Sequence, residues 1–252
     1  MHLLSTVVTL VVTLSTPTLA IIGGGATGGN FYEYTVALYQ PAIAERAATP
    51  FICDGVLVGP STVVTIAECV QGLTKSELTV RAGLTRATYK TFNTSSITVH
   101  PNYNSDTLAN DVAIIKLSTP IRNIAAANLA PSNWGYPDRN QTVIGWGSTK
   151  NNTQALSTSL RSVTVSPMAA DTCAKKLSSC KYTLDSAQHY CTVAKQGKGW
   201  FYGDAGGPII NPDGLVVGLV SGSPICAQPD GIALELRVSH FHDWIMSHVT
   251  KK

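Results

Sequence analysis

The chain has 252 residues, of which 44% are hydrophobic and 13% are charged, and its formal net charge is +3. This length suits one large all-β domain or two small ones, and the composition allows a sizeable hydrophobic core. So small a net charge, without basic runs or nucleic-acid motifs, argues against a nucleic-acid partner and against an anionic membrane surface.

Residues 1–20 are typical of a secretory signal peptide. An apolar, Thr-rich run, Leu3–Leu14, is followed by small residues that end at Ala20, which fits the small-x-small rule for cleavage. The run is too short to span a bilayer, and no later segment has the ~20 apolar residues that a membrane span needs. We expect residues 1–20 to be removed and residues 21–252 to form one secreted, extracellular domain.

Export makes disulfides and N-linked glycans relevant to this chain. The sequence has six cysteines, and oxidising compartments favour their pairing. Three sequons, which begin at Asn93, Asn140 and Asn151, are candidate glycosylation sites in a eukaryotic secretory route, although such triplets also arise by chance in Ser- and Thr-rich sequence.

Beyond residue 20 the chain consists mainly of short apolar runs rich in Val, Ile and Thr, separated by Gly, Pro, Asn and Ser. Such runs predict many short strands and favour an antiparallel barrel or sandwich. In chain order the expected strands are Tyr34–Leu38, Gly55–Val58, Val63–Ile66, Ser96–Val99, Val112–Leu117, Val143–Gly145, Val163–Val165 and Leu215–Val220.

Helices and a crossover complete the expected elements. Only Met168–Leu177 and the C-terminal Val238–Val249 have the apolar spacing of helices. The proline-containing segment Leu117–Arg139 is the expected crossover between two halves of the chain.

A series of short motifs runs through nearly the whole chain. In order they are IIGG at 21–24, VVTIAECV at 63–70, HPNYNSDTLANDVAIIKL at 100–117, VIGWG at 143–147, GDAGGP at 203–208, LVSGSPIC at 219–226 and the pair Trp244-Ile245. In this order they resemble the chymotrypsin-like serine proteases of the chymotrypsin/trypsin family. A single match can arise by chance, whereas the ordered series is specific. The resemblance implies an all-β fold of two antiparallel six-stranded β-barrels with a C-terminal α-helix.

The resemblance assigns a catalytic triad to three positions, and this chain keeps one of its members. The family reaction needs a hydroxyl nucleophile, an imidazole that takes its proton and a carboxylate that orients the imidazole. Ala205 stands at the nucleophile position and Glu68 at the imidazole position, whereas Asp111 matches the carboxylate. In another hydrolase with this triad, loss of the serine or the histidine alone lowers kcat by about 10⁶. We therefore expect no protease activity.

The substrate pocket that the resemblance implies is also changed. The position at the bottom of the primary pocket falls on Gly199, so an acidic residue is missing there. Trp200, Phe201 and Tyr202 stand where the family usually has small residues and a cysteine. Trp200 could plug the pocket, or the aromatic residues could fill the space of an absent disulfide. All three are candidate partner-binding residues, because loops on a rigid scaffold vary at low structural cost.

The resemblance implies two cysteine pairings, Cys53–Cys69 and Cys173–Cys191. A rearranged Cys180–Cys226 bridge and a Cys180–Cys191 bridge are open alternatives for Cys180. The usual partner of Cys226 is missing because Phe201 stands at its position. Sequence alone does not decide this connectivity.

One ion pair of the family is expected to be kept. In the family the amine of the first mature residue pairs with the buried aspartate before the nucleophile, and these positions are Ile21 and Asp204 here. Cleavage after Ala20 would leave Ile21 at the front, and an isolated buried charge at Asp204 would be strongly destabilising. The alternative is that both residues are relics of the scaffold.

Together these departures predict a secreted pseudoenzyme that acts by binding a protein. Its features are similar to those of the glucanase inhibitor proteins of oomycete plant pathogens, which bind and inhibit endo-β-1,3-glucanases of the host and so suppress plant defence. The similarity rests on a signal peptide that leads directly into the mature N-terminus, on the lack of an accessory domain and on the broken triad. No short motif indicates the glucanase itself. The alternative is a binding cofactor for another secreted protein.

Two other functions are weaker interpretations. Glu68 and Asp111 are expected side by side, which would raise one pKa as in an acid–base dyad. They would stand nearer than the ~5 Å that glycosidase carboxylates require, and a Glu68 hydrogen-bonded within a vacated cleft is the simpler interpretation. His240 and His242 fall on different faces of the last helix and are a weak metal signal. We expect no metal and no cofactor.

Overall fold

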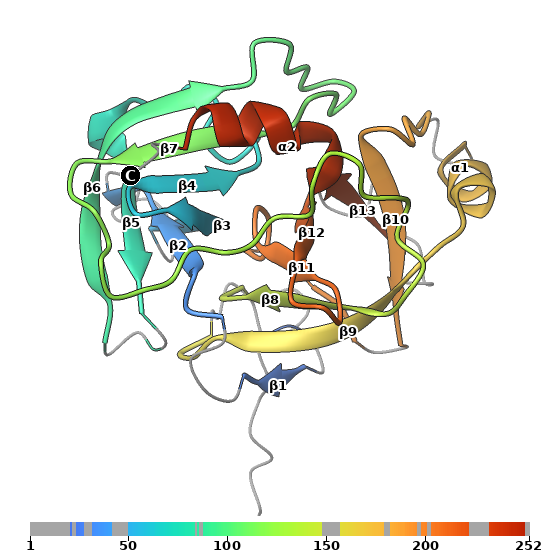
Figure 1. The fold of residues 1–252 in the computed structure, drawn as a ribbon, viewed down its shortest axis with the longest axis horizontal. Coiled ribbons are helices and arrows are strands. Elements are labelled where there is room, and N and C mark those ends of the chain that lie inside the picture. Colours follow the sequence, from blue (N-terminus) through green and yellow to red (C-terminus); the bar gives the residue numbers. More distant parts are fainter. Residues whose placement is uncertain are drawn as a thin grey trace, which may run out of the picture.

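The computed structural model describes residues 21, 24–27, 32–41, 50–83, 85, 88–147, 157–178, 182–195, 198–200, 203–221 and 232–249. Within these residues the chain forms two β-barrels, the helices α1 (Ala170–Ser178) and α2 (Val238–Ser247) and a short 3-10 helix at Lys75–Glu77 (Figure 1). None of the helices in the described residues is long and apolar enough to cross a membrane.

The first barrel closes on itself in the strand order β2-β3-β4-β7-β6-β5, and neighbouring strands are antiparallel. Its strands are β2 (Thr35–Tyr39), β3 (Phe51–Gly59), β4 (Thr62–Thr65), β5 (Thr79–Ala82), β6 (Lys90–Val99) and β7 (Ala113–Leu117). Every residue of β2 is buried. Alternate side chains point to opposite faces, so that Val36 and Leu38 join an apolar cluster within this barrel, whereas Ala37 and Tyr39 join a cluster shared with the second barrel.

The second barrel follows the order β9-β10-β13-β12-β11-β8, closes through the pairing of β8 with β9, and has β1 added at β9. Its strands are β1 (Gly25–Ala26), β8 (Gln141–Gly145), β9 (Arg161–Pro167), β10 (His189–Ala194), β11 (Pro208–Ile210), β12 (Val216–Val220) and β13 (Ile232–Arg237). The long segment between β7 and β8 joins the two barrels, as the proline-containing crossover predicted (Figure 1).

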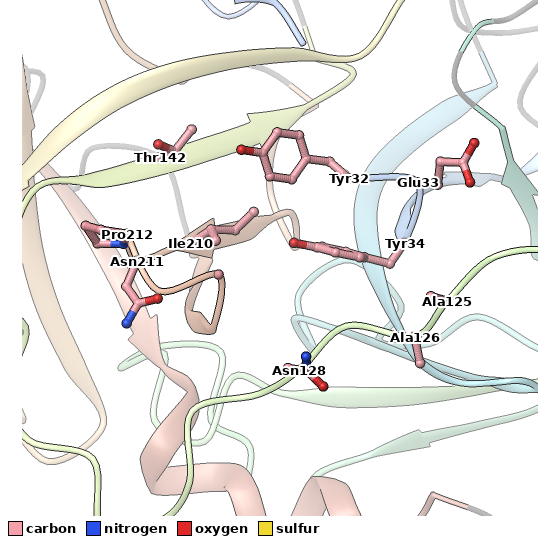
Figure 2. Close-up of a pocket in the computed structure, with 11 residues that line it drawn as sticks. Tyr32, Glu33, Tyr34, Ala125, Ala126, Asn128, Thr142, Ile210, Asn211 and Pro212 are labelled. Atoms are coloured by element: carbon pink, nitrogen blue, oxygen red, sulfur yellow. The ribbon is translucent and has the colours of Figure 1, made fainter. Parts of the chain in front are cut away.

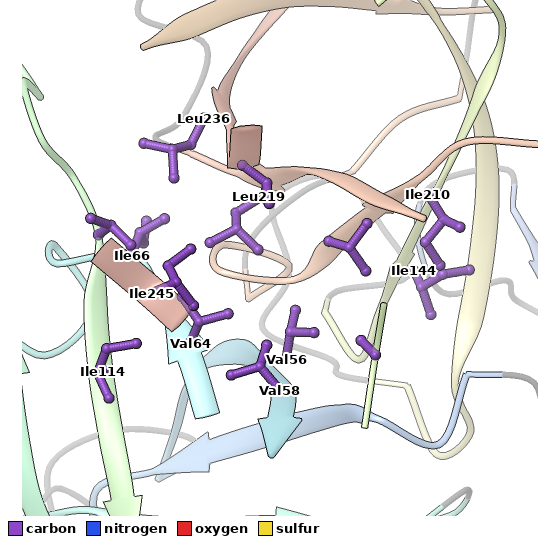
Figure 3. Close-up of a cluster of buried hydrophobic side chains, with 14 of the residues drawn as sticks. Val56, Val58, Val64, Ile66, Ile114, Ile144, Ile210, Leu219, Leu236 and Ile245 are labelled. Atoms are coloured by element: carbon purple, nitrogen blue, oxygen red, sulfur yellow. The ribbon is translucent and has the colours of Figure 1, made fainter. Parts of the chain in front are cut away.

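One apolar cluster connects both barrels and the C-terminal helix. It includes Val56 and Val64 of the first barrel, Ile144 and Leu219 of the second, and Ile245 of α2 (Figure 3). Burial of these side chains away from water stabilises the packing of the barrels against each other. The former triad positions lie at this junction.

The predicted fold class, two six-stranded antiparallel barrels with a C-terminal helix, is confirmed. Each predicted strand and helix overlaps an observed element, whereas β1, β5, β10, β11 and β13 were not predicted. In β5 and β13 the apolar pattern is interrupted by Arg81 and Glu235. The tertiary structure accommodates both charges: Arg81 lies 3.8 Å from the centre of the Tyr39 ring, and Glu235 is hydrogen-bonded in the interior.

Candidate functional site

The three former triad positions lie together where the barrels meet. Glu68 follows β4, Asp111 precedes β7, and Ala205 lies in the turn before β11. The backbone N–H of Glu68 donates a 2.8 Å hydrogen bond to Asp111 Oδ1. Next to Glu68, the Sγ atom of Cys69 lies 3.9 Å from the carbonyl oxygen of Ala205. The site thus contains a buried carboxyl group, an exposed glutamate side chain and a methyl group.

Asp111 is fully buried, and burial is the main reason why its pKa is raised to about 7. Hydrogen bonds from the Glu68 N–H and from the Ser221 hydroxyl, which donates to Asp111 Oδ2 at 3.3 Å, lower this pKa. The negative charge of Glu68 raises it. Burial, followed by the charges of Asp111 and Glu68, raises the pKa of Tyr103 to about 12. One carboxyl group of the pair therefore has a raised pKa, with burial contributing more than the neighbouring charge.

The turn that carries Ala205 has a conformation that depends on glycine. Gly203 and Gly206 have φ values of 93° and 79°, and a Cβ on Gly206 would collide with Thr65 Oγ1 and with the carbonyl oxygen of Asp54. The Asp54 N–H donates a 2.8 Å hydrogen bond to the Ala205 carbonyl. Neither the Gly203 N–H nor the Ala205 N–H donates to a backbone carbonyl of the described residues. The turn is held in place although its central side chain has no hydroxyl.

Two carboxyl groups are buried together beside this turn, and sequence analysis identified only one of them. Asp204 and Asp54 are both fully buried. Asp204 Oδ1 accepts a 2.9 Å hydrogen bond from the Gly147 N–H, and Asp54 Oδ2 accepts one of the same length from the Trp146 N–H. A Cβ on Gly145 would collide with both carboxyl groups. Burial, followed by the charge of Asp204, raises the pKa of Asp54 well above its ordinary value.

Ile21, the expected partner of Asp204, is fully buried and packs with Val143 and Val220 of the second barrel. The expected ion pair needs the free amine that cleavage after Ala20 would create. Residues 1–20 lie outside the described residues, and the ion pair stays a prediction.

Trp200 is hydrogen-bonded to an acid that sequence analysis missed. Its indole N–H donates a 2.8 Å bond to Glu235 Oε1, and the Thr192 hydroxyl donates a 2.7 Å bond to the same oxygen. Glu235 is fully buried, and burial raises its pKa to about 7, although both hydrogen bonds lower it. A glutamate within the apolar run IALELR was the available signal. Trp200 packs against the second barrel's core, whereas Phe201 and Tyr202 lie outside the described residues.

Two disulfides are present in the described part of the chain. Cys53–Cys69 has a Cα–Cα distance of 6.1 Å, and Cys173–Cys191 has one of 5.6 Å. The second bridge excludes the alternative pairing of Cys191 with Cys180. Both Cys180 and Cys226 lie outside the described residues.

The remaining candidate residues lie on the surface or outside the described residues. Asn93 and Asn140 are exposed, and Asn151 falls in a segment that the structure does not describe. His242 Nδ1 lies 2.8 Å from Asp243 Oδ1 in the middle of α2. Among the described residues no group of three or more His, Cys, Asp or Glu could hold a metal ion.

Comparison with known proteins agrees with this geometry. A family model described as Trypsin matches residues 21–245. The chain is 30% identical over 239 residues to a trypsin of Phaedon cochleariae, covering 91% of this chain and 88% of that protein. It is 29% identical over 236 residues to trypsin delta of Drosophila melanogaster, covering 90% of this chain and 88% of that protein. A solved structure titled "Structure of GrC" has the same fold, with a TM-score of 0.75 at 23% identity, and the match covers 90% of this chain and 98% of that one. The chain therefore belongs to the trypsin family.

Proposed function

We propose that this member of the trypsin family has no protease activity and acts by binding another protein. The observation that carries the proposal is the methyl side chain of Ala205, which stands where the family reaction needs a hydroxyl nucleophile. Glu68 supports it, because the contact with Asp111 is made by the Glu68 backbone N–H. Asp111 therefore orients the peptide group of Glu68, and Glu68 replaces the imidazole that would take up the proton of a nucleophile.

Activity assays test the first half of this proposal. The purified protein is expected to release no product from peptide substrates with basic, apolar or small side chains before the scissile bond. Cleavage that Asp111→Asn abolishes would contradict the proposal, because it would show that the remaining triad member still works.

A double variant, Glu68→His with Ala205→Ser, tests the pocket separately. It is expected to be a poor protease, because Trp200 is held by Glu235 in a region that the resemblance assigns to the primary pocket. Robust cleavage by the double variant would refute the argument about the pocket and leave the argument about the missing side chains intact.

The partner we propose is a plant endo-β-1,3-glucanase, inhibited by the secreted protein to suppress host defence. Support comes from the similarity to oomycete glucanase inhibitor proteins and from the two disulfides, which fit an oxidising compartment. The contact surface we propose includes Trp200, Phe201 and Tyr202. A binding cofactor for a different secreted protein is the alternative.

The direct test is a titration of the purified protein into a plant endo-β-1,3-glucanase assay that follows sugar release. Loss of activity near one-to-one stoichiometry is expected, and Trp200→Ala is expected to weaken it. A matched control is Trp134→Ala, which changes an indole outside the proposed surface. Absence of inhibition across several plant enzymes would overturn the glucanase assignment, and equal loss in both variants would overturn the surface.

An enzyme that uses Glu68 and Asp111 is a second candidate, favoured only by the raised pKa of Asp111, about 7. A carboxyl group with this pKa can exchange a proton near neutral pH. Glu68→Gln should change a carboxylate-dependent activity, and an unchanged function in every assay would exclude this candidate.

A further inference from the structure

The protein has a cavity of about 500 Å³ whose lining includes no former triad residue. Its walls come from the segment before β2, from the linker between the barrels, from β8 and from the turn between β11 and β12 (Figure 2). The second barrel therefore lines it together with two segments that connect the barrels. The volume falls within the ~300–1,000 Å³ range of small-molecule sites.

Several side chains of the lining have hydrogen-bonding groups that remain unused. Within the described residues, Tyr32, Tyr34, Asn128 and Thr142 make no side-chain hydrogen bond. Figure 2 shows the rings of Tyr32 and Tyr34 extending from one wall toward β8 and β11, with their hydroxyl ends leading. Burial is the main cause that raises the pKa of Tyr34 to about 12, so its phenol stays neutral and can donate or accept.

Among the described residues, the side of the cavity that the tyrosine hydroxyl groups face has no charged side chain, which favours a neutral ligand there. Glu33 is its one ionisable side chain besides the tyrosines, and it points away from their rings in Figure 2. Without a basic side chain the lining offers no ion pair to an anion, and its one carboxylate, which would pair with a cation, lies away from the tyrosine hydroxyl groups. Ile210 adds an apolar surface. Hydroxyl and amide groups around an apolar patch suit a compact ring that carries many hydroxyl groups.

A candidate source of such a ring, the predicted glycosylation site at Asn140, lies next to the cavity in the same chain. Thr142 is the third residue of the sequon that begins at the exposed Asn140. Residues two apart in extended chain share a face and lie about 7 Å apart. The hydroxyl of Ser166 on β9 donates a 2.8 Å hydrogen bond to Asn140 Oδ1. Two residues before Ser166 on the same strand, Thr164 is the register partner of Thr142. The glycosylation site and the Thr142 wall of the cavity are therefore on the same face of the sheet.

We propose that this cavity binds a neutral saccharide through Tyr32, Tyr34, Asn128 and Thr142. The sugar comes either from an N-glycan on Asn140 or from a free oligosaccharide, and the same side chains would bind both. The inference does not depend on the proposed function.

The first experiment uses protein made without glycosylation and two probes, N,N′-diacetylchitobiose and cellobiose, measured by saturation-transfer NMR and calorimetry. Saturable binding is expected, and Tyr34→Phe, which removes one hydroxyl and keeps the ring, should weaken it by about tenfold. Thr142→Val should act in the same direction. Thr164→Val is the matched control and should leave affinity unchanged. Absence of saturable binding for both probes, or equal weakening by the two threonine variants, would overturn the proposal.

The second experiment distinguishes the two sources in protein secreted from eukaryotic cells, with occupancy of Asn140 measured by mass spectrometry. If its own glycan fills the cavity, the glycosylated protein should bind diacetylchitobiose at least about tenfold more weakly than Asn140→Gln from the same cells. Equal affinity, or an unmodified Asn140, would assign the cavity to a free oligosaccharide. Lack of probe binding by Asn140→Gln would overturn the proposal for both sources.

Discussion

Replacing Glu235 by glutamine should remove part of the pH dependence of folding stability. Burial raises the pKa of Glu235 from its ordinary value of 4.5 to about 7 in the folded protein. The folded state therefore binds the proton more tightly than the unfolded state, and stability falls as pH rises from about 4.5 through about 7. At about 1.4 kcal/mol per pKa unit, the loss is about 3 kcal/mol, complete above the folded-state pKa.

The glutamine side chain keeps the oxygen that accepts from Thr192 and Trp200 and has no charge to bury. Its amide group adds a buried polar group, but any resulting destabilisation is independent of pH and cancels in the comparison. The free energy of unfolding is measured by urea denaturation of both proteins at pH 4 and pH 8, followed by circular dichroism.

The decrease between the two pH values should be about 3 kcal/mol larger for the natural protein than for Glu235→Gln. The change of tryptophan fluorescence with pH should be larger in the natural protein than in Glu235→Gln, because the Trp200 indole donates to the titrating group. An equal pH dependence in both proteins would refute the conclusion that burial raises the pKa of Glu235.

Three further predictions concern stability. Burial lowers the pKa of His189 from 6.5 to about 4, so the contribution of this group to stability should fall by about 3 kcal/mol as pH decreases from 6.5 to 4, and urea denaturation should show this difference between the natural protein and His189→Gln. The double variant Cys53→Ala/Cys69→Ala removes a bridge with a sequence separation of 16 and should lose about 3 kcal/mol in the same assay; a loss well below 1 kcal/mol would contradict the bridge's role. Arg139→Ala breaks an exposed ion pair with Asp213 and should leave the thermal midpoint of unfolding unchanged. A clear decrease of the midpoint would show that this pair stabilises the fold more than exposed ion pairs usually do.

The opposite signs for Glu235 and His189 have a common cause. Burial disfavours the charged form of each group, so that an acid loses stability on the alkaline side and a base loses it on the acidic side. Because the two pH windows overlap, the contributions of Glu235 and His189 largely cancel in the natural protein, and each becomes visible only by comparison with its own variant. As pH rises, Glu235→Gln should gain stability relative to the natural protein and His189→Gln should lose it, and a difference of the same sign in both variants would contradict one of the two assignments.

Much of the fold could be predicted because its signals are local. In β2, a strand of five residues, Val36 and Leu38 alternate with Ala37 and Tyr39, and many such runs favour an antiparallel barrel. Strand β13 was missed because Glu235 breaks the apolar run, and its burial depends on Thr192 and Trp200, which lie 43 and 35 residues away in the sequence.

The sequence by itself determined the fold class, the order of its motifs and the identity of the side chains at positions 68, 111 and 205. These are properties of residue type and spacing, which need no coordinates. Only the tertiary structure decided which acids are buried, that Asp54 lies beside Asp204, and that Tyr34 and Thr142 face one cavity. Burial and proximity depend on which distant segments pack together, and this information is not contained in any single stretch of the chain.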